Sequence, residues 1–217
     1  MKKCIILANG KPPQKQLVKY LINKGYSTVI CADGGANHAH KMKLVPDFII
    51  GDLDSISENV YNFYKNKSKI TKLTRQNDTD VEKALKLAIQ KGYKESVLLG
   101  VTGDRLDHTF CNLGIVIKFF KKIKSMIIAE NSILIPLTNK NTLTSIPGET
   151  ISLYGFNRRT VITTKGLKYP LTKTALPFGE RESTSNVSTS TEVKINVEGG
   201  VIFLIRDFNF LKSNDLF

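Results

Sequence analysis

Hydrophobic residues in the first part of the chain fall into short, almost unbroken runs. These runs occupy residues 4–8, 28–32, 48–51, 96–100 and 125–129. Continuous apolar runs of this length are typical of strands buried on both faces of a parallel sheet. The pattern therefore predicts that these segments form the strands of one buried sheet.

Between the runs, apolar residues recur at the spacing of an amphipathic helix. Residues 81–89 carry an apolar side chain every three or four positions and end at Gly92. Residues 17–22 and 110–120 show the same spacing. Because strands alternate with helices, we expect an α/β fold with an N-terminal open, mostly parallel sheet flanked by helices.

After Pro136 the pattern changes to short segments rich in β-branched residues, separated by turn residues. These segments are residues 141–146, 150–154, 158–163, 191–197 and 200–205. They predict a small C-terminal antiparallel β-sandwich or barrel domain. We therefore expect an α/β domain over residues 1–136 and a β domain over residues 137–217. The polar run at residues 173–190 is either a flexible linker or a binding loop, and its place inside a compact domain favours a binding loop.

The composition fits a globular protein. The 217 residues are 41% hydrophobic and 24% charged, which excludes a disordered chain, a collagen-like repeat and a coiled coil. Lys and Arg number 32 against 19 Asp and Glu, so the net charge is +13. Such an excess could attract nucleic acid, an anionic membrane or polyphosphate, but there is no basic block with interleaved aromatic residues. We expect a lysine-rich solvated surface, with neither a nucleic-acid partner nor a membrane partner.

Cysteine usage bears on the compartment. Cys4, Cys31 and Cys111 lie far apart and are odd in number, which argues against a disulfide framework and against a paired-cysteine zinc site. A reducing cytoplasm fits this pattern best. No stretch approaches the ~20 apolar residues that a membrane helix needs.

Polar and glycine-rich turns follow three of the predicted strands. The second strand leads into residues 33–37 (DGGAN), the third into 51–55 (GDLDS) and the fourth into 100–108 (GVTGDRLDH). Ligands of open α/β sheets bind beyond the carboxyl ends of the strands. We therefore expect these three turns to meet at one edge of the sheet.

Carboxylates in and near these turns are candidate metal ligands. Asp52 and Asp54 lie two residues apart, and in an extended segment both side chains point the same way. A divalent cation would relieve their repulsion, and Mg²⁺ prefers carboxylates with water and phosphate oxygens. The alternative is an ordinary turn that caps a helix. Asp80 is equally open to a metal role or a helix-dipole role, because Thr79 and Glu82 already form a capping box.

Other residues of these turns suit phosphate. Gly34, Gly35 and the glycines at 100 and 103 permit close backbone approach, and Arg105 adds a planar fork for phosphate oxygens. His108 is a general base, a positioning group or a helix-start residue, and we favour positioning. Neither a Walker loop nor the protein-kinase motif set occurs in the sequence. Together the turns indicate nucleotide phosphate transfer that depends on Mg²⁺.

Six motifs in a fixed order resemble the thiamine pyrophosphokinase family over nearly the whole chain. They are ADGGAN at 32–37, Pro46-Asp47 with GDLDS at 51–55, Thr79-Asp80, TGDRLDH at 102–108 with Asn112, GLKYPL at 166–171, and STSN at 183–186. None of them is decisive alone. The ordered set, divided between an α/β half and a β half, is specific.

The resemblance implies transfer of the terminal pyrophosphoryl group of ATP to the hydroxyl of thiamine, with release of AMP. It also implies Mg²⁺ and a homodimer that binds thiamine between its subunits. The implied catalytic and metal-binding residues are Asp52, Asp54 and Asp80. The implied nucleotide-binding residues are Asp33, Gly34, Gly35, Asn37, Thr102, Arg105, Asp107, His108 and Asn112. The implied thiamine-binding residues are Gln76, Asp80, Tyr169, Ser185 and Asn186.

The chain departs from the family pattern at three places. Relatives often have aspartate in place of Asn77. They often have two glycines in place of Gly103-Asp104, and tryptophan in place of Tyr169. These changes bear on substrate affinity more than on reaction type. Two other functions compete with this one. A sister pyrophosphokinase would act on another heterocyclic alcohol, such as a hydroxymethylpterin. A basic nucleic-acid-binding protein would explain the charge of +13 and none of the acidic turns.

Overall fold

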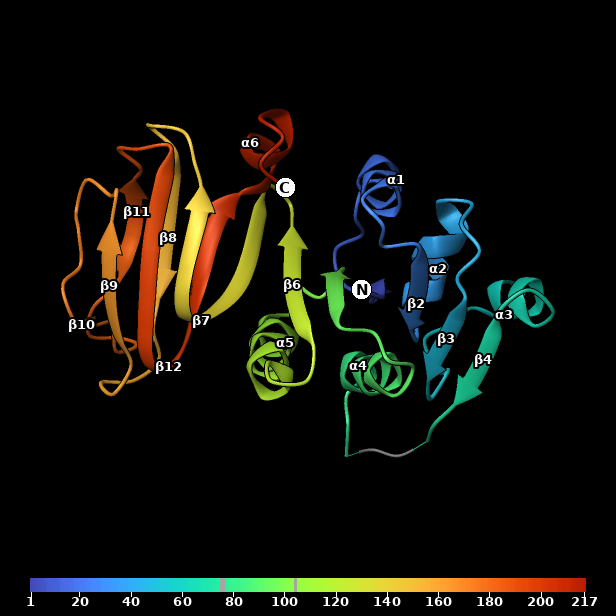
Figure 1. Ribbon diagram of the computed structural model, residues 1–217. Coiled ribbons are helices and arrows are strands. Elements are labelled where there is room, and N and C mark those ends of the chain that lie inside the picture. The colour runs from blue at the N-terminus through green and yellow to red at the C-terminus, as the bar shows by residue number, and fades with distance from the viewer. Residues whose placement is uncertain (75–76, 104) are drawn as a thin grey trace. The chain divides into compact units, whose positions relative to one another are not determined.

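The computed structural model describes residues 1–74, 77–103 and 105–217. The chain divides into two compact units, Met1–Glu130 and Asn131–Phe217 (Figure 1). The first unit ends before the expected boundary at Pro136, because the strand that contains Pro136 already begins at Ser132.

The first unit is built on one parallel sheet with the strand order β6-β5-β1-β2-β3-β4. The strands are β1 (Lys3–Leu7), β2 (Thr28–Ala32), β3 (Phe48–Gly51), β4 (Lys69–Lys72), β5 (Glu95–Leu99) and β6 (Lys124–Ala129). The apolar runs correspond to all of these except β4. That strand lies at the end of the sheet and has a lysine at each end around Ile70 and Thr71, so it has no continuous apolar run.

Helices cover both faces of this sheet, α1 and α2 on one and α4 and α5 on the other (Figure 1). The helices of the unit are α1 (Lys15–Asn23), α2 (Gly35–Lys41), α3 (Glu58–Tyr64), α4 (Asp80–Gln90) and α5 (Leu106–Phe119). The sandwiched strand β1 is fully buried from Cys4 to Leu7. The expected α/β architecture, with an open parallel sheet flanked by helices, is thus confirmed.

The chain changes direction across the sheet between β1 and β5. From β1 it passes outward to β2, β3 and β4, and it then returns to β5 and β6 on the other side. At the carboxyl ends of β1 and β5 the adjoining loops pack backbone against backbone: Gly10 N–H donates to Gly100 O at 2.7 Å, and Lys11 N–H donates to Thr102 O at 2.8 Å. A Cβ at Gly10 would lie 2.4 Å from Thr102 O, so this contact requires glycine. Such a reversal of strand order is where open α/β sheets bind ligands.

The second unit consists of antiparallel strands and a short C-terminal helix. Its elements are β7 (Ser132–Thr144), β8 (Thr150–Tyr154), β9 (Val161–Lys165), β10 (Thr174–Ala175), β11 (Ser183–Val187), β12 (Glu192–Asp207) and α6 (Phe208–Ser213). The long strand β12 pairs with β7, β8 and β9. Alternate residues such as Ile151, Leu153 and Leu204 point into a common apolar core. This unit confirms the expected antiparallel β domain.

Two local expectations for this unit were wrong. Residues 191–197 and 200–205 are one strand, because Gly199, with φ of +81°, lies in a shift of register between Val197 and Ile202 rather than in a turn. The polar run at 173–190 is also not wholly irregular, since it contains β10 and β11. Strand β11 escaped notice because its sequence STSNV is polar and its pairing with β8 is interrupted by a bulge.

Across the described ranges, every helix is too short or too polar to cross a lipid bilayer.

Candidate active site

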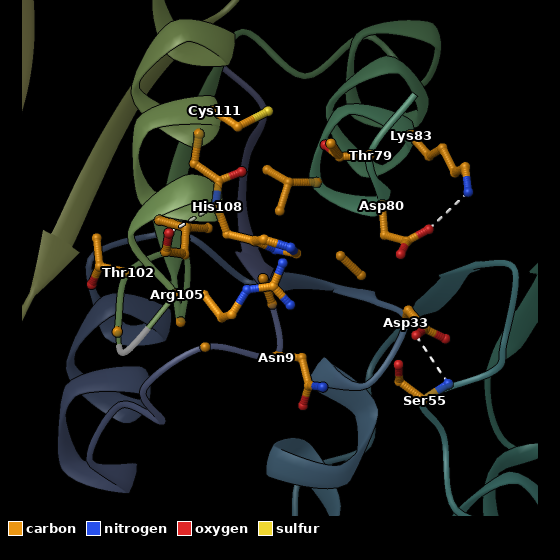
Figure 2. A pocket seen from close by; sticks show the side chains of 18 of the residues that line it. Asn9, Asp33, Ser55, Thr79, Asp80, Lys83, Thr102, Arg105, His108 and Cys111 are labelled. Carbon is orange, nitrogen blue, oxygen red and sulfur yellow. Dashed lines mark hydrogen bonds and ion pairs between the residues drawn. The ribbon is translucent and has the colours of Figure 1, made fainter. Parts of the chain in front are cut away.

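A cavity of about 660 Å³ opens at the carboxyl ends of β1, β2, β3 and β5 (Figure 2). Its walls come from the loops after these strands and from the first two turns of α4 and α5. The three polar turns predicted to converge therefore meet in one place. The loop after β1, which contributes Asn9 and Gly10, is a fourth wall that the sequence reasoning missed. Its signal in the sequence is the polar Asn9-Gly10 pair directly after the first apolar run.

Three carboxylates gather in this cavity, from Asp33, Asp52 and Asp80, and we call them the acid cluster. One oxygen from each lies within 4.8 Å of the other two. Asp33 and Asp52 come directly after the ends of β2 and β3, and Asp80 is the first residue of α4. The N-cap Thr79 fixes this helix start, because its Oγ1 accepts a hydrogen bond from Glu82 N–H at 3.3 Å.

Asp33 is the buried member of the acid cluster, with 4% of its surface exposed. Its Oδ2 accepts a hydrogen bond from Ser55 N–H at 3.2 Å, whereas its Oδ1 is buried without a hydrogen-bond partner in the described part of the chain. Burial raises the pKa of the Asp33 carboxyl, the Asp80 charge raises it further, and the hydrogen bonds from Ser55 offset this only in part. A buried oxygen without a donor is the kind of group that a bound cation would satisfy.

Gly51 allows the acid cluster to form. A Cβ at this position would lie 2.7 Å from Asp33 Cβ and 3.2 Å from Asp80 Oδ1. A side chain here would therefore push apart two of the three carboxylates. This gives Gly51 of the GDLDS motif a steric role.

Asp54 lies outside the acid cluster. The expected extended conformation of residues 52–54 was wrong, because Leu53 has φ of +66° and turns the chain. Asp54 N–H therefore lies 3.4 Å from Asp52 Oδ1, and the exposed Asp54 carboxylate accepts a hydrogen bond from Ser55 Oγ at 2.9 Å. Asp33 stands in the cluster where the spacing of the sequence predicted Asp54.

Basic and polar groups line the α5 side of the cavity (Figure 2). Arg105 donates from Nε and Nη2 to the two carboxylate oxygens of Asp107, at 2.9 and 2.6 Å. The Arg105 guanidinium holds the pKa of Asp107 well below its usual range. Asn112 is buried, and its Nδ2 donates to Val101 O at 2.7 Å, which ties α5 to the loop after β5. Thr102 and His108 complete this wall.

The predicted residues at the start of α2 act through neighbouring segments of the site. A Cβ at Gly35 would lie 2.0 Å from Leu7 O, and one at Gly34 would meet the Asn9 side chain at 2.4 Å, so both glycines let α2 approach β1. Asn37 donates to Ser55 O at 2.8 Å and thereby holds the loop after β3. These three are absent from the described residues that line the cavity.

The predicted residues of the second unit lie near each other. Tyr169 is 61% exposed, and the exposed Ser185 has φ of +53° within the bulge of β11. Asn186 is 2% exposed, and its side chain hydrogen-bonds to the Tyr169 backbone. Gln76 lies outside the described residues.

Two further side chains of the cavity were missed in the sequence. Lys83 lies one turn after Asp80 on α4, with its Nζ 2.9 Å from Asp80 Oδ1. Cys111 lies one turn after Asp107 on α5 and is exposed. The arrangement as a whole sets carboxylates on one side of a cavity and an arginine with glycine-rich loops on the other. Such a cavity suits a polyphosphate together with a divalent cation.

Known proteins resemble this chain in sequence and in fold. The family model described as the thiamin pyrophosphokinase catalytic domain matches residues 19–128, and the model of the vitamin B1 binding domain of thiamin pyrophosphokinase matches residues 133–202. Thiamin pyrophosphokinase 1 of Caenorhabditis elegans is 29% identical over 98% of this chain and 92% of its own length. Thiamine pyrophosphokinase 1 of Oryza sativa subsp. japonica is 28% identical over 81% of this chain and 77% of its own length.

Solved structures share the fold. The thiamine pyrophosphokinase from Bacillus subtilis superimposes with a TM-score of 0.81, at 23% identity, over 95% of this chain and 99% of that chain. The thiamin pyrophosphokinase from Candida albicans gives a TM-score of 0.80, at 20% identity, over 94% of this chain and 90% of that chain. At these identities the likeness bears on the fold alone.

Proposed function

Because the chain belongs to the thiamin pyrophosphokinase family, we propose that it transfers the pyrophosphoryl group of ATP to the hydroxyl of thiamine. The products are thiamine pyrophosphate and AMP. The observation that carries this proposal is the acid cluster, which faces Arg105 and the glycine-rich loops in one cavity of the domain that matches the family's catalytic model. The matches to both family models favour thiamine over a hydroxymethylpterin as the acceptor.

The acid cluster fits Mg²⁺. It offers hard carboxylate oxygens at mutual distances suited to one ion, and its member Asp33 has an oxygen, Oδ1, that is buried without a partner among the described residues. We propose Asp52 and Asp80 as ligands together with Asp33, and the neighbouring Asp54 as a further ligand or as a group that faces the pyrophosphoryl oxygens. When bound, Mg²⁺ neutralises charge on the phosphates and so favours attack on them.

The other cavity residues would hold the nucleotide. The triphosphate would pair with the guanidinium of Arg105, which now faces Asp107, and would approach the backbone of the loop with Gly100 and Thr102 closely. His108 lines the same wall as a positioning group. A primary alcohol is a poor nucleophile, and the negative charge of a polyphosphate opposes attack on its phosphorus atoms, so placing the two reactants in line supplies much of the catalysis.

Thiamine recognition is assigned to the second unit and to Gln76, on the family resemblance. An exposed tyrosine such as Tyr169 suits a planar cationic ring through stacking and cation–π attraction. The exposed Ser185 is held beside β8, because its N–H donates to Ser152 Oγ at 2.9 Å, and Asn186 fixes the Tyr169 segment. A homodimer is proposed on the same resemblance, and sedimentation of the purified chain tests it. The three free cysteines support a reducing compartment, and we propose the cytoplasm.

The experiment is an incubation of the purified chain with Mg²⁺, ATP and thiamine, after which the products are separated. We expect AMP and thiamine pyrophosphate in equal amounts. A parallel incubation with a hydroxymethylpterin in place of thiamine should give no AMP above the background. Formation of ADP, or reaction with the pterin but not with thiamine, would contradict the proposal.

A further inference from the structure

Lys83 lies in the active-site cavity without a role in the function proposed above. Its side chain is 5% exposed, and its Nζ lies 2.9 Å from Oδ1 of Asp80 (Figure 2). Among residues 1–74, 77–103 and 105–217, Asp80 is the one acid with which Lys83 forms an ion pair. Figure 2 shows the two side chains reaching toward each other from α4.

Burial distinguishes Lys83 from other lysines that pair with acids of α4. Lys86 and Lys118 both contact Glu82, and their side chains remain 41% and 58% exposed. Their ammonium groups therefore keep much of their hydration. Lys83 loses most of its own, which is costly unless a fixed negative charge compensates. An ordinary surface ion pair does not explain why the Lys83 side chain is buried.

The charge of the acid cluster gives a reason for Lys83. The carboxylates of Asp33, Asp52 and Asp80 repel one another at distances within 4.8 Å. Lys83 adds one positive charge directly at Asp80. The ionised group of three carboxylates and one ammonium has a formal charge of −2, which a single divalent cation balances.

We propose that Lys83 is a resident cation of the acid cluster, which neutralises Asp80 in the nucleotide-free protein and keeps the affinity of the cluster for a free divalent cation low. A free cation is repelled by the ammonium at short range. A cation that arrives on a triphosphate brings negative oxygens with which the ammonium can pair. Lys83 thus makes cation and nucleotide bind together. This inference rests on the proposed function, since it takes the acid cluster as the metal site.

The test is a titration of the full chain with Mn²⁺, monitored by electron paramagnetic resonance, with and without a non-hydrolysable ATP analogue. We expect Lys83→Met to bind free Mn²⁺ at least about tenfold more tightly than wild type, or about 1.4 kcal/mol. Lys83→Arg keeps the charge and should stay near wild type. The matched control is Lys118→Met, which removes a lysine paired with Glu82 rather than with the acid cluster, and it should also stay near wild type. In wild type, the analogue should strengthen Mn²⁺ binding by the protein.

Equal or weaker binding of free Mn²⁺ by Lys83→Met would overturn the proposal. If that variant does not fold, Lys83→Gln replaces it. The wild-type chain gives an independent result, because Mn²⁺ affinity that is as high without the analogue as with it would also overturn the proposal. If either of these results is found while the wild-type chain produces AMP and thiamine pyrophosphate, the role of Lys83 is refuted and the proposed function stands. A chain that produces no AMP refutes the proposed function instead.

Discussion

The side-chain amide of Asn186 binds both backbone polar groups of Tyr169. Tyr169 N–H donates to Asn186 Oδ1 at 3.1 Å, and Asn186 Nδ2 donates to Tyr169 O at 2.7 Å. Asn186 is 2% exposed, so this double contact is shielded from water. The amide therefore fixes the backbone from which the exposed Tyr169 ring projects.

We expect Asn186→Ala to weaken thiamine binding without an equal effect on ATP. Loss of the amide leaves the backbone groups of Tyr169 without their partner, which costs about 1–3 kcal/mol of stability. Steady-state kinetics should show a KM for thiamine raised by roughly tenfold or more, because small displacements of positioning groups are costly. The control is Asn196→Ala, whose amide contacts only the exposed Glu198 among the described residues. Equal rises in both KM values would contradict this account.

Tyr169 itself offers a test of cation recognition. Removing the ring in Tyr169→Ala should raise the KM for thiamine by roughly 2- to 30-fold, from a cation–π contribution of about 0.5–2 kcal/mol. Tyr169→Phe and Tyr169→Trp keep a ring and should stay near wild type. Thermal unfolding of all three should change little, because the side chain is largely exposed. A Tyr169→Ala variant with unchanged kinetics would remove this residue from the thiamine site.

Substitution of Asp54 should affect catalysis and leave stability almost unchanged. Its carboxylate is exposed, and its side chain contacts Ser55 Oγ, so Asp54→Asn should leave the melting temperature within a few degrees of wild type. If it faces the cation or the pyrophosphoryl oxygens, turnover should fall by roughly 100-fold or more. Glu58→Gln, at an exposed acid on α3, is the matched control and should remain active. An active Asp54→Asn enzyme would leave the acid cluster of Asp33, Asp52 and Asp80 as the whole metal site.

The three cysteines should differ sharply in reactivity. Burial raises the pKa of Cys4 to about 12 and also raises that of Cys31, so both thiols remain protonated and inaccessible at pH 8. Cys111 is exposed in the cavity wall. We expect iodoacetamide to label Cys111 alone, as measured by mass spectrometry, and Cys4 to stay unlabelled as the pH rises to 10. Bound nucleotide should slow the labelling of Cys111, and an unchanged rate would place the nucleotide elsewhere.

The sequence predicted the elements whose residues are buried on both sides. Strand β1 is an example, because helices on both faces of the sheet bury every side chain from Cys4 to Leu7. Short elements without an apolar run or stripe escaped prediction. Helix α2 has the sequence GANHAHK, which lacks an apolar stripe, and its packing depends on Gly35 lying against Leu7 O. Such contacts between distant segments leave no periodic signal.

Part of the site could be predicted because it follows from the order of the strands along the chain. The positions of Asp33 and Asp52 are set by strand connectivity, since each comes directly after a strand. Asp33 takes the place of Asp54 in the acid cluster because Leu53 has a left-handed backbone, a conformation that a non-glycine residue rarely adopts and that the sequence therefore did not predict. Lys83 was overlooked because the capping box of Thr79 and Glu82 already explained that stretch.

Pyrophosphoryl transfer as proposed requires that the acid cluster and Arg105 act on one triphosphate. A crystal structure of the full chain with Mg²⁺ and a non-hydrolysable ATP analogue measures this directly. We predict a cation bound by Asp33, Asp52 and Asp80, with the phosphate chain between this cation and Arg105. A nucleotide bound away from the carboxyl ends of β1, β2, β3 and β5, or a triphosphate without contact to these carboxylates through the cation, would contradict it.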